Sequence, residues 1–105
     1  MVDEDVTPKP PIDQVRRQYE DAIDSQNYRA AAEYAYALAV RLREIGLIDE
    51  ACRFAHECLR LAETLPSDTL DEVISTRQSV GGVPLPEYFH DEVVRWRLAP
   101  LLEPA

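Results

Sequence analysis

The stretch from Asn27 to Leu65, NYRAAAEYAYALAVRLREIGLIDEACRFAHECLRLAETL, decides the fold. Its first half is apolar on most of a helical circumference, which is typical of a helix with neighbours on more than one side. Gly46 interrupts the pattern where a left-handed residue commonly ends a helix, and Pro66 ends the second half. So short a link predicts that helices over 28–45 and 48–65 form an antiparallel hairpin.

Shorter helices are predicted on both sides of this hairpin. Upstream, apolar residues at spacings of three and four indicate a helix over 11–24. Downstream, Thr69 and Glu72 are spaced as a capping box, which predicts a short helix that ends at Gly81-Gly82.

Residues 83–86 are predicted to be an extended connector, because each proline biases the preceding residue away from helix. A final helix is predicted over 87–99. We therefore expect an all-α fold, a small antiparallel bundle of four to five helices. Residues 1–10 read as a disordered acidic and Pro-rich lead, 11–99 as a single domain and 100–105 as a tail.

Small and apolar residues recur at regular positions along the hairpin: Leu38-Ala39, Leu42, Gly46, Ala51, Ala55 and Cys58, followed by Pro66. In this pattern the hairpin resembles a tetratricopeptide repeat (TPR) over about residues 27–66. Ala39, Leu42, Ala55 and Cys58 stand where the family has Gly, an aromatic, a large apolar residue and a second Ala. An ordinary helical bundle predicts the same core, so both readings stay open.

The TPR resemblance implies a concave groove lined by the first helix of the repeat. The matching positions here are Glu33, Tyr36, Val40, Arg43 and Glu44. Packing of Tyr36 and Val40 against a neighbouring helix is the alternative.

The charge and the cysteines exclude several classes of protein. The 105 residues carry a net charge of −9, so no basic stripe exists for nucleic acid and anionic membranes are disfavoured. No apolar run approaches the roughly 20 residues of a membrane span, and we do not expect the acidic start to be a signal peptide. Cys52 and Cys58, six residues apart on one helix, cannot pair. Two free thiols fit a reducing compartment, and we expect a cytoplasmic protein.

The residues that could support chemistry do not form a complete site. Cys52 and His56 share one helical edge, but Cys58 lies on another, whereas zinc needs three or four converging ligands. Glu87 and His90 have the spacing of half a di-iron site, without a second pair. We therefore expect no catalytic residues, no metal and no cofactor. A small metal- or thiol-dependent enzyme or sensor that uses Cys52, His56 and Cys58 is the alternative.

A partner surface is predicted instead. The C-terminal aromatic and Arg residues have the composition of an interface hot spot, although Phe89 and Trp96 closing the core is the favoured alternative. Val94 and Leu98 fall on the opposite face, where a second neighbour, such as another chain, would pack. The candidate partner-binding residues are Tyr36, Val40, Arg43, Leu85, Tyr88, Phe89, Trp96 and Arg97.

The hypothesis is a non-enzymatic protein–protein interaction or adaptor module of a larger assembly. Its partner is another protein, or a second copy in a homo-oligomer. A helical subunit that stabilises a larger assembly is a further reading.

Overall fold

The computed structural model of the chain describes residues 10–64, 79–85 and 91–102, with the backbone alone for 91–93. In these ranges the elements are α1 (Ile12–Asp24), α2 (Tyr28–Glu44), α3 (Ile48–Glu63), β1 (Ser79–Val80), β2 (Val83–Pro84), α4 (Asp91–Leu98) and the 3-10 helix η2 (Ala99–Leu101).

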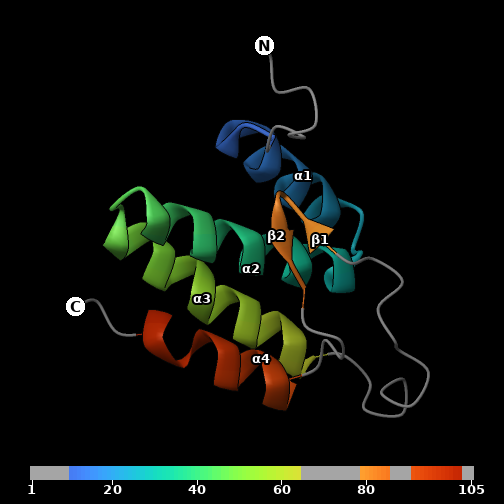
Figure 1. Ribbon diagram of the computed structural model, residues 1–105. Helices are drawn as coiled ribbons and strands as arrows, with labels where there is room; N and C mark the ends of the chain where they lie inside the picture. Colours follow the sequence, from blue (N-terminus) through green and yellow to red (C-terminus); the bar gives the residue numbers. More distant parts are fainter. Residues whose placement is uncertain (1–9, 65–78, 86–90, 103–105) are drawn as a thin grey trace.

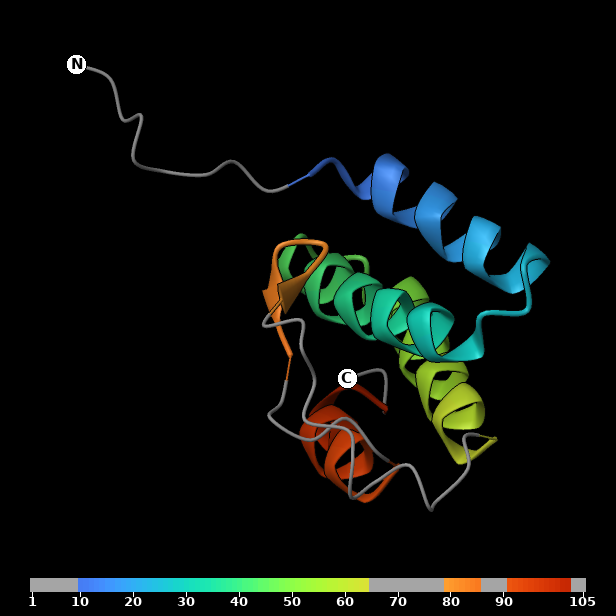
Figure 2. The same ribbon diagram turned by 90° about the vertical axis from the view of Figure 1, so that its right-hand side faces the viewer.

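The four α-helices of the described ranges stack in chain order (Figure 1): α1 packs on α2, α2 on α3, and α3 on α4. A two-stranded hairpin, β1–β2, lies beside α2 (Figure 2). The expected small all-α fold is confirmed, and the predicted pair of long helices lies at its centre.

Local backbone chemistry explains both helix breaks. Gly46 at φ 91° ends α2 in a Schellman motif, in which Leu47 N–H donates to Leu42 O (2.9 Å) and Gly46 N–H to Arg43 O (3.0 Å). The α1–α2 break repeats the motif with Gln26 at φ 60°, a rare conformation for a non-glycine residue. The two motifs reverse the chain sharply, which places α2 between α1 and α3.

Helix α2 is buried on most of its circumference, as its sequence predicts. Its alanines let α1 and α3 approach closely, and Leu38 and Leu42 fill the remaining space at 0% exposure. Glu33, one of the positions that match the expected groove, is only 4% exposed. Arg29 Nε lies 3.2 Å from its Oε2, and this ion pair one turn away offsets part of the cost of burying the carboxylate.

The prediction that a helix ends at Gly81-Gly82 is wrong. Ser79–Val80 pairs antiparallel with Val83–Pro84, and the two glycines, at φ 59° and 84°, form the type I′ turn between the strands. The rest of that predicted helix lies outside the described residues. The turn packs tightly, because a Cβ on Gly81 would lie 3.0 Å from Ala37 Cβ and 3.2 Å from a Val15 methyl.

Arg41 of α2 joins this hairpin to the start of the chain. Its guanidinium donates to the backbone carbonyls of Pro10 and of Gly81, the latter at 3.1 Å. A charged side chain thus supplies donors to two carbonyl groups that have no place in a helix or ladder.

The described part of the expected tail, residues 100–102, is not an irregular extension. After α4 the backbone tightens into η2, which packs against both α2 and α3. Pro100 stands inside this 3-10 turn, where its missing N–H removes no bond. Residues 86–90, where the last helix was expected to begin, lie outside the described residues.

Candidate functional site

Helix α4 has one buried face and one open face. Val94 and Leu98, one turn apart, are both 0% exposed, whereas Trp96 between them is 74% exposed. In a helix, residue i+2 points about 200° away from residue i, so burying the aliphatic pair turns Trp96 outward. The expectation that Trp96 closes the core is therefore wrong, and Val94 and Leu98 face this chain's own core.

The open side of α4 is aromatic and cationic. Arg97 Cζ lies 5.7 Å from the centroid of the Trp96 ring, within cation–π range. Arg95 Nη2 lies 2.7 Å from Glu63 Oε2 of α3, and both side chains are more than half exposed. We call Arg95, Trp96 and Arg97 the α4 face.

Of the three candidates that precede α4, only Leu85 lies within the described residues. Leu85 is half-buried and packs against the core cluster. Tyr88 and Phe89 lie outside the described residues.

The candidates on α2 are covered by the chain itself. Tyr36 is 5% exposed, Val40 is half-buried, and Arg43 Nη1 donates to Pro100 O at 3.2 Å. Burial raises the pKa of Tyr36, and the nearby positive charge of Arg97 acts in the opposite direction. The expected groove is thus not an open surface in this arrangement, because Tyr36 is buried and η2 packs against α2.

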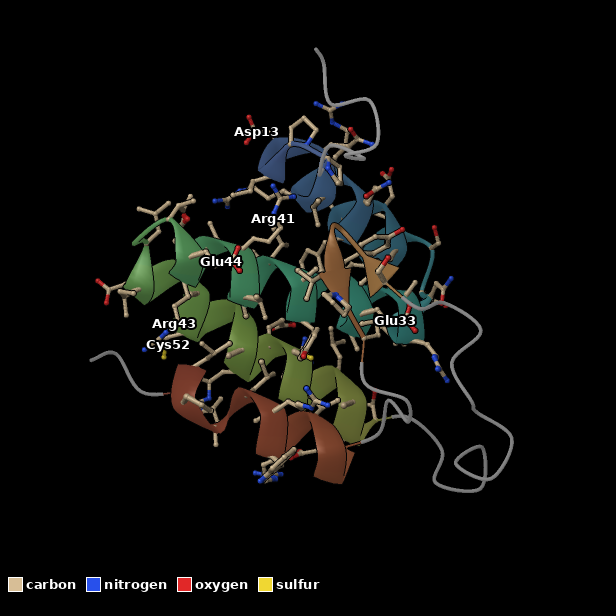
Figure 3. The ribbon with its side chains drawn as sticks, viewed as in Figure 1. Asp13, Glu33, Arg41, Arg43, Glu44 and Cys52 are labelled. Carbon is tan, nitrogen blue, oxygen red and sulfur yellow. The ribbon has the colours of Figure 1, made fainter. Side chains whose placement is uncertain are left out.

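Cys52 and His56, on one edge of α3, both contact the backbone of residue 102. The Cys52 thiol donates to Leu102 O at 3.0 Å, and His56 Nε2 lies 3.0 Å from the same oxygen. Figure 3 shows Cys52 beside Arg43, near the end of α4. We call Arg43, Cys52 and His56 the carbonyl clamp, because all three meet backbone carbonyls of residues 100 and 102.

Cys58 takes no part in the carbonyl clamp. Its thiol is 0% exposed and donates to Ala32 O at 3.2 Å. Burial raises its pKa, and the carboxylates of Glu33 and Glu57 add to the increase. Cys52, His56 and Cys58 therefore do not converge, and the described ranges hold no group of three or more His, Cys, Asp or Glu arranged for a metal ion.

A polar cluster lies between α1 and α3. The sequence did not indicate it, because Tyr19 belongs to the apolar stripe of its helix. Burial, reinforced by the charge of Glu57 and a hydrogen bond to it, raises the pKa of Tyr19 to about 12. Glu57 also forms an ion pair with Arg60. The Tyr19 ring meets Phe54 edge-on at 5.5 Å between centroids. A surface pocket of about 210 Å³ lies here, lined by Tyr19, Glu20, Ile23, Asp24, Glu57 and Arg60.

Sequence reasoning missed the carbonyl clamp for a simple reason. Its acceptors are main-chain oxygens, which any residue offers, so the sequence around 100–102 carries no pattern to find. The spacing of Cys52 and His56 on one helical edge was visible, but it pointed toward a metal.

Comparisons with protein-family models, with curated proteins and with solved structures found no match to the chain. Within the described ranges, none of the helices has the length and apolar character that crossing a membrane requires.

Proposed function

We propose that the chain is a non-enzymatic protein-interaction module, a TPR-like helical adaptor that acts in the cytoplasm as part of a larger assembly. The α4 face contacts the partner, and the stacked helices α1–α3 hold it in place. The partner is a protein, either a different one or a second copy of this chain, since a net charge of −9 disfavours both nucleic acid and anionic membranes.

The 74% exposure of Trp96 carries this proposal. A helix that buries an aliphatic pair and leaves a tryptophan in water has a large apolar area still to cover. Burying about 150 Å² of that ring would contribute roughly 4 kcal/mol at about 25 cal/mol per Å². Tryptophan and arginine are also the residues most enriched where alanine substitution damages binding.

The thiol and imidazole geometry favours this function over an enzyme. Cys52 and His56 hold a backbone carbonyl, and Cys58 donates into the core. Two free thiols, one half-buried and one buried, agree with the reducing compartment proposed here.

The test compares two exposed aromatic residues by affinity capture from an extract of the source organism. Trp96→Ala should reduce partner retention by at least about 30-fold, which is the about 2 kcal/mol of a hot spot. Tyr28→Ala, at a residue 42% exposed at the start of α2, is the matched control and should leave retention unchanged. Helical circular dichroism should be the same for both variants.

Full retention by Trp96→Ala would contradict the assignment of the α4 face. A stoichiometric metal in the purified protein, or an activity lost in Cys52→Ala, would contradict the non-enzymatic reading.

A further inference from the structure

The α4 face is a cationic spot on an acidic protein. The chain has 20 Asp and Glu against 11 Lys and Arg, yet this face presents Arg95, the exposed Trp96 indole and Arg97, whose guanidinium lies over that indole. Arg95 already pairs with Glu63. Arg97 lies over the Trp96 ring, and no carboxylate within the described ranges forms an ion pair with it. A carboxylate-rich partner segment is therefore attracted here and repelled by most of the remaining surface.

The chain itself carries a segment of that chemistry. Residues 1–9, MVDEDVTPK, lie outside the described residues and contain three successive carboxylates, Asp3, Glu4 and Asp5, between Val2 and Val6. Acidic side chains suit the two arginines, and the flanking valines suit the indole. Nine residues reach at most about 30 Å from Pro10.

The start of the described chain lies on the wrong side for docking within one molecule. Pro10 is held by Arg41 beside α1 and the hairpin. Helix α4 packs on the far side of the α2–α3 pair, as Figures 1 and 2 both show. A second copy can bring its own α4 face to this segment without that detour.

We propose that residues 1–9 of one copy dock on the α4 face of a second copy, with carboxylates at Arg97 and Arg95 and with Val2 and Val6 against Trp96. Reciprocal docking gives a closed, two-fold dimer in which each copy provides one segment and one face. This inference rests on the proposed function, because it assigns an occupant to the same surface.

The first experiment uses sedimentation equilibrium of the full chain over a range of concentrations. Exposed ion pairs are screened by salt, so the dimer dissociation constant should rise at least about tenfold between about 0.05 M and 0.5 M salt. Trp96 is the single tryptophan, so its fluorescence reports the face directly. Dimerisation should shift its emission to the blue and reduce quenching by acrylamide.

Charge reversal makes the test specific. Arg97→Glu alone, or Asp3, Glu4 and Asp5 all changed to Lys, should weaken the dimer at least about tenfold. Combining both sets of changes should restore it to within about threefold of the original, because attraction of the opposite sign replaces the first. Arg17→Glu, on an exposed position of α1, is the control and should leave the dimer intact.

Helical circular dichroism of each variant should match that of the native chain, which separates a lost contact from a loss of folding. A chain that stays monomeric at low salt, a dimer indifferent to the lysine triple variant, or a combined variant without recovery would each overturn the docking. A monomer that still captures another protein through Trp96 would overturn only this inference. A Trp96→Ala variant normal in both capture and dimerisation would overturn the proposed function as well.

Discussion

Helices α2 and α4 both combine aromatic and arginine residues with small and aliphatic ones, but their aromatic residues differ in solvent exposure. Tyr36 of α2 is 5% exposed, whereas Trp96 of α4 is 74% exposed. Helix α2 has α1, α3, the β-hairpin and η2 as neighbours, while the large contact of α4 is with α3. The number of neighbours, more than the composition of the helix, decides which aromatic residue stays in water.

The same contrast applies to the arginines. Arg41 and Arg43 of α2 donate to backbone carbonyls of residues 10, 81 and 100, so they join distant segments to the centre. Arg97 of α4 lies over an exposed ring. Helix α2 is thus the scaffold on which three segments are fixed, and α4 is an outer layer with a free side.

The largest expected effect separates the two helices by a matched truncation. Leu38→Ala in α2 should lower the free energy of unfolding of the whole domain by about 2–5 kcal/mol, because the cavity lies among several helices. Leu98→Ala, equally buried, should act mainly on α4, an eight-residue helix that depends on its packing.

Urea unfolding followed by circular dichroism measures the first effect, and native-state hydrogen exchange the second. Exchange should rise across α4 in Leu98→Ala while α2 and α3 keep their protection. Equal loss of protection in all helices would show that α4 is as integral to the core as α2.

The next effect compares two glycines with positive φ. Gly81→Ala should cost about 1–3 kcal/mol for the contact with Ala37 and Val15, in addition to about 1 kcal/mol for the left-handed backbone. Gly46→Ala should cost only the latter, since nothing lies within 4 Å of its added Cβ. Similar urea midpoints for the two variants would mean that the hairpin can move away from α2.

The sequence was most informative where short-range chemistry sets the structure. Asn27 caps α2 through its side chain, Gly46 ends the helix, and the apolar pattern between them fixes a central helix. It was least informative at Val80 and Val83, because two-residue strands are too short to show an alternating pattern and Gly-Gly also ends helices.

The orientation of α4 could not be predicted from periodicity. Two faces of α4 have apolar residues at helical spacing: one has Val94 and Leu98, and the other has Trp96 with its neighbours one turn away. Periodicity alone would allow either face to be buried. Contact with α3 selects the aliphatic pair, and that contact joins residues far apart in sequence. The carbonyl clamp depends on the same long-range packing, so its residues were visible as types but not in their role.

A smaller effect concerns the clamp. Arg43→Ala should cost about 1 kcal/mol, the usual contribution of one hydrogen bond, and should loosen residues 99–102. Thiol labelling followed by mass spectrometry measures this loosening, since half-buried Cys52 should react faster in the variant. Cys58 should stay unreactive in both proteins because it is buried and its pKa is raised. An unchanged Cys52 rate would show that Arg43 does not hold the segment.

The smallest effect is a pH dependence at the α1–α3 contact, far from α4. Tyr19 has a pKa of about 12 in the fold against 10.0 in the unfolded chain. The raised value means that its stabilising contribution is complete below pH 10 and is lost as the pH rises toward 12, because the unfolded chain releases its proton first. Urea unfolding at pH 9 and at pH 11 should therefore show a larger loss in the native protein than in Tyr19→Phe. Tyr36 and Cys58 also have raised pKa values, but both proteins share them, so the difference between the two losses belongs to Tyr19. Equal losses would mean that the phenol is already well solvated and that the bond to Glu57 contributes nothing.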